Sequence, residues 1–423
     1  MSLPDYDDYS DIDPWDDESR WSEAESQMDG KPQVLIVGAG IGGLMLGNLL
    51  LKRGLGILEE LKAIGKPSIA AHIYNANQKP LLSLDFSERA DLLLLSKIPE
   101  ENIHLGKKIL WFTQDEDGVT IRTSDKKFFH GDILVGADGA YSAVRQSLYK
   151  SLKAKGSLPA VDDVPLPFDC VCLVGQTEPM DPEEFPGLKL PNTQCKYVVD
   201  GQEYSESSKD HDSFRNSEWG PEQAEAMCKE VRHFKVPIGK EGAIVTMGDL
   251  IDKTPKDLIS KVMLEEKLFE TWFEGRVVLL GDACHKMNPA GGAGAQTAIQ
   301  DAVALANWIS TLQSPTPSDI ETIFKEYRAE RYPVAKSAFA TSQMFKRLGG
   351  TSTASTLMRA FFKRIPRWLM KKIISRRDAA RPQASFLPLV EDTGKSKPLS
   401  QPSLHKTLEL FRVQSAAAST TTV

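Results

Sequence analysis

Gln33-Val-Leu-Ile-Val37 leads directly into Gly38-Ala-Gly-Ile-Gly-Gly43, and this junction decides the fold. The first run is short, apolar and rich in β-branched residues, which is typical of a buried parallel strand, and a helical pattern continues over residues 44–53. A G-x-G-x-x-G motif supplies one glycine for a tight turn, one for close approach to a pyrophosphate and one for helix packing. Glycine-rich turns also close ordinary strand-to-helix corners, but this position favours a dinucleotide site. The motif consists of Gly38, Gly40 and Gly43.

Two later junctions repeat the pattern of a strand followed by glycine and aspartate. Ile133-Leu-Val135 leads into Gly136-Ala-Asp-Gly139, with a helix predicted over residues 141–148. Far downstream, Arg276-Val-Val-Leu-Leu280 leads into Gly281-Asp282. Although these segments are distant in the sequence, we expect them to belong to one nucleotide-binding sheet.

The remaining apolar patterns indicate a meander, a second lobe and long helices. Alternation over residues 108–113, 118–123 and 127–130, with Asp117-Gly118 as a turn, predicts a β-meander. The apolar runs of residues 159–272 are short, so this stretch is predicted to be a second lobe built on a sheet. Helical periodicity is strong over residues 295–312 and 320–345.

The composition narrows the class of protein. With 41% hydrophobic and 26% charged residues, the 423-residue chain is expected to form one two-lobed unit or two domains. The net charge of -7 offers no basic field, so nucleic acid is not expected as a partner. No window supplies the roughly 18 apolar residues of a spanning helix. The five cysteines lack CxxC spacing, which predicts neither a metal site nor a disulfide framework and fits a reducing compartment.

Three segments, in order along the chain, resemble the flavin aromatic hydroxylases and, within that family, the fungal epoxidases of isoprenoid and indole-diterpene intermediates. They are VLIVGAGIGGL from Val34, GADGAYSAVR from Gly136, and GRVVLLGDACHKMNPAGGAGAQTAIQDAVALA from Gly275. The resemblance implies an α/β fold in which a Rossmann-like FAD-binding sheet is interleaved with a β-sheet substrate lobe. It also implies FAD as cofactor, with NAD(P)H and dioxygen as co-substrates.

The resemblance assigns roles to individual residues. The motif of Gly38, Gly40 and Gly43 would bind the ADP pyrophosphate, and Asp282 would accept hydrogen bonds from the ribityl hydroxyls. A turn or helix cap is the alternative for Asp282. Three residues are expected beside the flavin and nicotinamide, namely Asp138, Gly139 and Arg145. Four are expected against the isoalloxazine ring or at the helix that begins there, namely Pro289, Gly292, Gly294 and Ala295.

Two further polar residues have ordinary alternatives. Arg89 resembles the family arginine that reaches the ring region, but it can also pair with Glu88 or Asp91 on the surface. His285 follows the third junction, and a lone histidine is more often packed in the structure than a base, so it is assigned no catalytic role. The catalytic residues stay unknown because the cofactor supplies the oxygen chemistry.

The chain departs from the family pattern in two places. Related folds carry a second strand that ends in an acid about 20 residues past the glycines, where it holds the ribose. By their spacing from the glycines, Glu59 or Glu60 can take that role. By resemblance, however, residues 55–65 are similar to a helix that comes later in the family's sequences, so the second strand and its acid are predicted to be missing. The polar stretch at residues 204–208 stands where the family has long apolar strands. A shortened, weakly active or inactive member is therefore an open alternative.

The C-terminal region offers a second open choice. Residues 359–381 are basic and amphipathic, with bulky apolar side chains between lysines and arginines. Such a segment can lie on an anionic membrane or cap the body of the protein with its basic face in solvent, and the second is slightly favoured. The expected location is intracellular, either cytoplasmic or peripherally membrane-associated.

These observations divide the chain into five regions. They are an acidic disordered tail (1–30), a first FAD-binding part with the meander (31–158), an incomplete substrate lobe (159–272), a second FAD-binding part with helices (273–350), and a basic amphipathic helix with a loose tail (351–423). The predicted function is FAD-dependent hydroxylation or epoxidation of a hydrophobic organic substrate. The alternatives are a flavin reductase or dehydrogenase and a non-catalytic binding protein.

Overall fold

The computed structural model defines the fold for most of the chain. It describes residues 32–51, 68–75, 80–85, 102–189, 192–198, 221–236, 238–240, 242–348, 352–366, 368–369, 379–391 and 397–420. Arg89, the Glu59 and Glu60 pair, the acidic segment 1–30 and the polar stretch 204–208 lie outside these residues.

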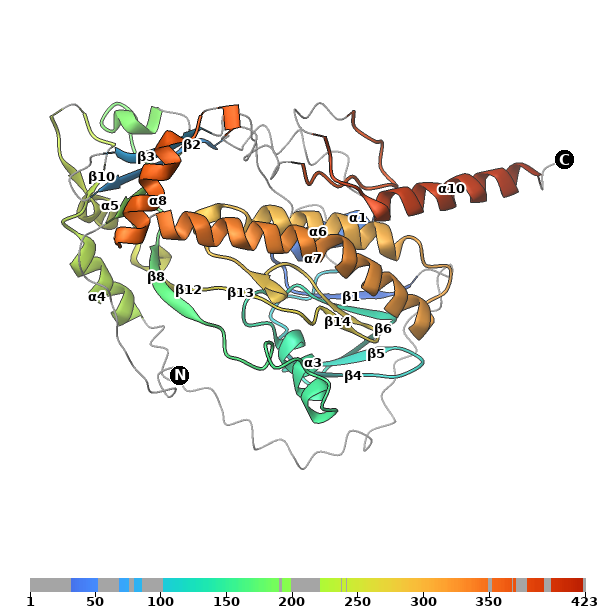
Figure 1. Cartoon of the computed structure of the whole chain (residues 1–423). Helices are drawn as coiled ribbons and strands as arrows, with labels where there is room; N and C mark the ends of the chain where they lie inside the picture. Colours follow the sequence, from blue (N-terminus) through green and yellow to red (C-terminus); the bar gives the residue numbers. More distant parts are fainter. Residues whose placement is uncertain are drawn as a thin grey trace.

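A four-stranded sheet forms the centre of the molecule (Figure 1). Its strands in spatial order are β1 (Val34–Val37), β7 (Ile133–Gly136), β15 (Val277–Leu279) and β14 (Phe273–Glu274). Both β1 and β15 run parallel to β7, so their carboxyl ends lie side by side, with Gly136 level with Val37 and Leu279. The prediction that the three junctions share one sheet is confirmed.

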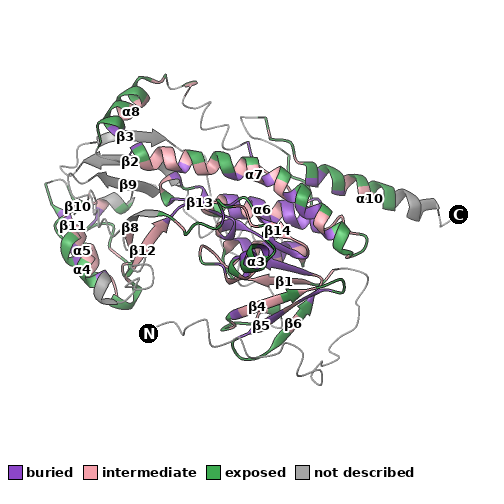
Figure 2. Ribbon diagram, turned by 60° about the horizontal axis from the view of Figure 1, so that its bottom comes forward, coloured by how far each residue is buried: buried purple, intermediate pink, exposed green. Residues whose placement is uncertain are grey.

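Helices cover this sheet and bury its apolar strands. All residues of β7 and β15 are buried, as expected for parallel strands with both faces covered. Gly42 lets α1 pack closely against Leu280 and Ala298, because a Cβ on Gly42 would lie 2.4 Å from the Leu280 side chain and 3.4 Å from Ala298 Cβ. Figure 2 shows the buried residues gathered between the sheet and α6. The covering helices are α1 (Ile41–Leu50), α3 (Ala143–Ala154), α6 (Gly294–Ile309) and α7 (Pro317–Leu348).

The start of α3 is set by caps that the apolar pattern does not show. The helix was expected from residue 141 but begins at Ala143, since the Ser142 side chain accepts a hydrogen bond from the Arg145 backbone N–H. Asp138 Oδ2 accepts a second from Ala143 N at 2.7 Å. Cap geometry therefore moved the boundary by two residues.

The predicted meander is present, and its strands are β4 (Ile109–Gln114), β5 (Val119–Thr123) and β6 (Phe128–Gly131). Asp115 closes the first turn, because its Oδ1 accepts hydrogen bonds from the backbone N–H groups of Asp117 and Gly118. The alternation of apolar residues thus sufficed to predict this element.

The second lobe contains several small sheets. In one, β2 pairs antiparallel with β3 and parallel with β9, so residues 68–85, which were assigned to the first FAD-binding part, join a strand of the predicted substrate lobe. In another, β8 pairs antiparallel with β12. The strands of this lobe and of the short ladders are β2 (Ser68–Asn75), β3 (Pro80–Asp85), β8 (Phe168–Val174), β9 (Asn192–Val198), β10 (Lys235–Val236), β11 (Val245–Thr246), β12 (Ser260–Glu265), β13 (Lys267–Leu268) and β16 (His285–Lys286).

The C-terminal region is more ordered than expected. The prediction of a loose tail from residue 392 onward is wrong for α10 (Pro402–Thr420), which begins against α6 and α7. Its Ser403 and Thr407 are fully buried because they bond to polar groups of those helices, which a polarity pattern cannot reveal. The other helices are α4 (Pro221–Val231), α5 (Met247–Asp252) and α8 (Thr353–Arg364), with 3-10 turns η5 (Pro186–Lys189), η7 (Lys256–Leu258), η8 (Gly281–Ala283) and η9 (Pro289–Gly291).

Candidate functional site

Three glycine-bearing corners meet at the carboxyl edge of the central sheet. The corner after β1 touches the corner after β7, because a Cβ on Gly38 would lie only 2.4 Å from the carbonyl oxygen of Ala137. The corner after β15 touches α6, since a Cβ on Gly281 would lie 3.0 Å from Ala298 Cβ. Gly38 and Gly281 also have positive φ angles of 110° and 63°, which favour glycine. Ligands of open α/β sheets bind at this edge.

Two helix N-termini at this edge lack the caps that protein helices usually have. Within the described part of the chain, neither α1, with Gly40 as N-cap, nor α6, with Ala293, has a side-chain cap or an acidic residue in its first turn. By contrast, α3 is capped by Ser142. The first N–H groups of α1 and α6 are therefore available to an anion, which the helix dipoles would also favour. Gly40 leaves room for it, because the nearest atom to an added Cβ is 3.9 Å away.

Asp282 lies beside the N-terminus of α6. Its Oδ1 is 3.9 Å from the position that a Cβ on Gly294 would take, and its side chain is 35% exposed. Its Oδ2 pairs with Lys286 Nζ at 2.8 Å. The sequence did not predict a role for Lys286. The one available signal was its spacing of four residues from Asp282. One oxygen of the carboxylate is thus paired with Lys286, while the other lies near the N-terminus of α6.

Asp138 is engaged with its own helix. Its Oδ2 accepts hydrogen bonds from Ala143 N at 2.7 Å and Val144 N at 3.3 Å, while Oδ1 is buried and has no hydrogen-bond partner among the described residues. Gly139 beside it has a φ of 81° with open space around an added Cβ. The geometry gives Asp138 a capping role, and its contact with flavin stays a prediction.

Arg145 faces inward and joins two of the corners. Its Nη1 donates to the carbonyl of Ala283 at 2.8 Å and its Nη2 to that of Ala140 at 2.5 Å, and its guanidinium carbon lies 4.3 Å from the centre of the Phe269 ring. Burial lowers the pKa of Arg145, but nearby groups, led by Tyr149, oppose that shift. The buried Arg145 therefore connects the corner after β7 with the corner after β15, and its direct contact with the cofactor stays a prediction.

The loop between Asp282 and α6 is shaped by its glycines. Asn288 caps η9, since its side chain accepts a hydrogen bond from Ala290 N at 3.0 Å. Gly291 packs directly on Ser342 of α7, where an added Cβ would lie 2.8 Å from the Ser342 Cα. Gly292 has a left-handed φ of 55° with open space around it. Pro289 and Gly292 thus lie in this loop, while Gly294 and Ala295 begin α6, and the contact of all four with the flavin ring stays a prediction.

Comparisons with known proteins point to the same segment. Residues 245–342, which include this loop and the whole of α6, match the family model of the FAD binding domain. The chain is 30% identical over 294 residues to the FAD-dependent monooxygenase paxM of Penicillium paxilli, covering 63% of this chain and 58% of that protein. It is 28% identical over 398 residues to the FAD-dependent monooxygenase nodM of Hypoxylon pulicicidum, covering 84% and 82%. The chain is thus similar to FAD-dependent monooxygenases over most of its length. The comparisons support the predicted resemblance to this family and the predicted cofactor, FAD.

Solved structures of other proteins share the fold of this chain. The structure of Klebsiella pneumoniae HpxO complexed with FAD and uric acid matches with a TM-score of 0.56 at 15% identity, covering 82% of this chain and 97% of that one. The structure of 2,6-dihydroxypyridine-3-hydroxylase from Arthrobacter nicotinovorans matches with a TM-score of 0.52 at 16% identity, covering 76% and 94%. The predicted α/β fold of the aromatic hydroxylase type is confirmed.

The residues at this edge of the sheet fit FAD as a cofactor. A diphosphate needs N–H donors and a close backbone, which the uncapped α1 and Gly40 offer. Ribityl hydroxyls need an acceptor, which Asp282 offers, and the electron-rich edge of a reduced ring needs positive charge, which the N-terminus of α6 offers. Arg89 lies outside the described residues, so its role stays a prediction.

Proposed function

We propose that the protein uses FAD, NAD(P)H and dioxygen to hydroxylate or epoxidise a hydrophobic organic substrate. The observation that carries the proposal is the meeting of three glycine corners at two uncapped helix N-termini, with Asp282 beside the N-terminus of α6. The names of its relatives, FAD-dependent monooxygenases, support the reaction class. When bound, FAD supplies the transfer of hydride from NAD(P)H and the activation of dioxygen.

The protein's own groups would bind, orient and shield the reactants. The N–H groups of α1 would hold the diphosphate, and Asp282 would fix the ribityl chain and hence the ring. The positive end of α6 would stabilise negative charge on the reduced ring without needing an acid. The corners rest on a fully buried core that includes Leu279 and Leu280, which keeps water from the inner side of the site.

A three-part experiment separates the proposal from its alternatives. The purified protein is examined for flavin absorption, its apoprotein is titrated with FAD, and NAD(P)H oxidation is followed under labelled dioxygen with a panel of apolar alkenes and arenes. A product that carries one labelled oxygen supports a monooxygenase. NAD(P)H consumption with a reduced, unlabelled product would favour a reductase, and failure of FAD to bind or to stabilise the protein against heat would favour a binding protein.

A weakly FAD-binding member is the second candidate function. Among the described residues, β1 pairs only with β7 and forms an edge of the central sheet. A second strand with a terminal acid would pair with the other side of β1 in a complete Rossmann half. Its loss would remove the contact to the adenosine ribose but leave the diphosphate and ribityl contacts, so the expected result is weakened rather than abolished FAD binding.

Contact with a membrane is part of the proposal, and α8 supports it. No helix within the described residues is long and apolar enough to span a bilayer. However, Leu357 and Phe361, one turn apart on α8, are 72% and 64% exposed, and Trp368 beyond its end is 68% exposed. Lys363 and Arg364 accompany them. Exposed apolar side chains beside cations suit the surface of an anionic bilayer, where an apolar substrate would also collect.

A further inference from the structure

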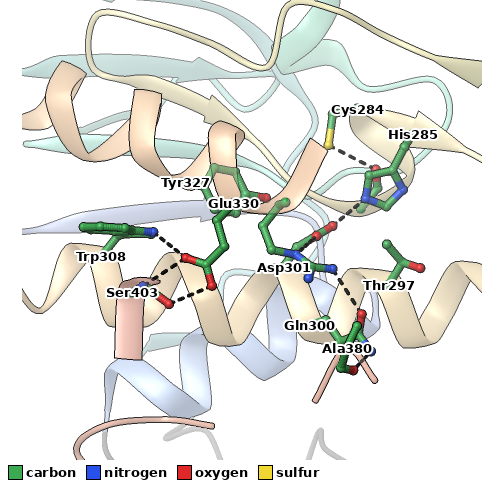
Figure 3. A network of polar contacts seen from close by, with 12 residues as sticks. Cys284, His285, Thr297, Gln300, Asp301, Trp308, Tyr327, Glu330, Ala380 and Ser403 are labelled. Carbon is green, nitrogen blue, oxygen red and sulfur yellow. Dashed lines mark hydrogen bonds and ion pairs between the residues drawn. The ribbon is translucent and has the colours of Figure 1, made fainter. Parts of the chain in front are cut away.

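A buried ion network joins α6 and α7 to the loop of residues 283–293, which is called the flavin loop below. His285 Nε2 lies 2.5 Å from Asp301 Oδ2, and Arg331 Nε donates to Asp301 Oδ1 at 2.8 Å. His285 and Asp301 are both 0% exposed and Arg331 is 3% exposed. Figure 3 shows His285 and Asp301 facing each other between α6 and the segment that follows Asp282. The three residues come from β16, α6 and α7 and therefore join three elements at one point.

Charge and hydrogen bonding give this network a defined arrangement. Burial alone would raise the pKa of Asp301, but attraction to His285 and Arg331 outweighs it and holds that pKa below its ordinary value. Asp301 is therefore an anion with both oxygens engaged. His285 Nδ1 is buried without a hydrogen-bond partner among the described residues. Because His285 Nε2 faces the ionised Asp301, this nitrogen carries a hydrogen and donates it to the carboxylate.

The network contacts the segment that joins Asp282 to α6. His285 is three residues after Asp282 and four before Pro289 along the chain. Asp301 is seven residues after the first residue of α6, about two turns from the N-terminus that would face the flavin ring. The Trp272 ring also packs beside His285, with 5.5 Å between the ring centroids. Asp301 is therefore tied to this segment directly at His285 and, through α6, to its C-terminal end.

We propose that Asp301 and His285 are positioning residues for the flavin: their buried contact sets the distance between Asp282 and the N-terminus of α6, and with it the affinity for FAD and the environment of the ring. This inference rests on the proposed function. Neither side chain reaches the edge of the sheet, since both are fully buried, so their effect on FAD passes through the loop. Contiguous buried networks transmit effects of this kind between neighbouring elements.

The test compares two substitutions of His285 that differ only in hydrogen bonding. His285→Gln keeps an N–H that can reach Asp301, whereas His285→Leu fills a similar volume without a donor. We expect His285→Gln to bind FAD within about threefold of the wild type and His285→Leu to bind about tenfold more weakly, with a shift of the flavin absorption bands. A role in packing alone would let Leu substitute as well as Gln.

Asp301→Asn tests the anion, and Glu330→Gln is its matched control. Glu330 is a carboxylate on α7 beside Arg331 that instead accepts hydrogen bonds from Ser403 Oγ at the start of α10 and from Trp308 Nε1 of α6. Asp301→Asn should weaken FAD binding by about tenfold, and Glu330→Gln should leave the affinity and the spectrum unchanged. If Asp301→Asn fails to fold, the His285 pair decides, because it leaves the Asp301–Arg331 ion pair intact.

The outcomes separate this inference from the proposed function. Equal FAD affinity and identical spectra for the wild type, His285→Leu and Asp301→Asn would overturn the positioning role while leaving FAD binding established. Equal weakening by His285→Gln and His285→Leu would also overturn it, because the hydrogen bond would then be irrelevant. Absence of FAD binding by the wild-type protein would overturn the proposed function and the inference together.

Discussion

Lys286 Nζ lies 2.8 Å from Asp282 Oδ2, so the carboxylate predicted to hold the ribityl chain already has a cation as a partner. The two side chains are 21% and 35% exposed, which places the pair in a screened environment and limits its strength. The other oxygen of Asp282 lies 3.9 Å from the position that a Cβ on Gly294, the first residue of α6, would take. Lys286 therefore orients the carboxylate rather than replacing the cofactor as its partner.

Substitutions of this pair should have unequal effects. Asp282→Ala removes a charged acceptor and should weaken FAD binding by about 10- to 100-fold, the range for a hydrogen bond to an ion. Lys286→Met removes only a partly exposed ion pair and should weaken it less than about fivefold. Titration of apoprotein with FAD, followed by flavin fluorescence, measures both. A larger loss for Lys286→Met than for Asp282→Ala would contradict the assignment of Asp282 as the acceptor.

Two glycines of the first corner should respond differently to alanine. Gly40 has ordinary angles, φ -76° and ψ 175°, and open space, so Gly40→Ala should leave the thermal stability of the apoprotein unchanged. Its methyl group would occupy the place of the diphosphate and should lower FAD affinity at least about tenfold. Gly38 has a φ of 110° and an added Cβ would lie 2.4 Å from Ala137 O, so Gly38→Ala should destabilise the apoprotein by more than about 2 kcal/mol.

Thermal unfolding of both apoproteins, with and without FAD, checks this contrast. The predicted effect of Gly40→Ala would be contradicted if FAD stabilised this variant as strongly as it stabilises the wild type. In that case the N-terminus of α1 would not be the diphosphate site. The Gly38→Ala protein serves as the control for general damage to the corner.

The sequence predicted that the three corners meet at one sheet edge, because local rules determine this part of the structure. The three corners follow strands whose glycines permit only a few conformations, and parallel strands place their carboxyl ends together. Partners of buried polar residues were not predicted, since Asp301 meets Arg331 and His285 only after three elements pack. One signal was available: Asp301 lies among Ala298, Ala302 and Leu305 on the apolar face of its helix, where an acid needs a partner. The order of α10 was missed for the same reason.

The apolar side chains of α8 provide a test of membrane contact. Phe361→Glu removes an exposed ring and adds a negative charge beside Lys363 and Arg364, so binding to anionic vesicles should fall by about tenfold or more. Because the side chain is 64% exposed, folding should be unaffected. Co-sedimentation with phosphatidylserine vesicles measures the change, with pure phosphatidylcholine vesicles as the charge control. Wild-type protein that stays in the supernatant with both kinds of vesicle would rule out the contact.

The raised pKa of Glu330 predicts that the free energy of unfolding depends on pH. Its Oε2 accepts hydrogen bonds from Trp308 Nε1 at 3.0 Å and Ser403 N at 3.1 Å, yet burial outweighs these donors and raises the pKa of Glu330 above its ordinary 4.5. A carboxyl whose folded pKa is raised stabilises the protein fully below its unfolded pKa, and that contribution is lost as the pH rises through the folded value. Wild-type stability should therefore fall relative to Glu330→Gln above about pH 4.5.

Denaturant unfolding of both proteins at several pH values between about 4.5 and about 7 measures this difference. Gln is a suitable replacement, because its carbonyl can accept from Trp308 and Ser403 N while its amide donates to Ser403 Oγ, which now lies 3.1 Å from Oε1. The difference in unfolding free energy between the two proteins should change across this range, since Gln does not titrate. A difference that stays constant from about pH 4.5 to about pH 7 would mean that the environment of Glu330 does not favour the protonated carboxyl.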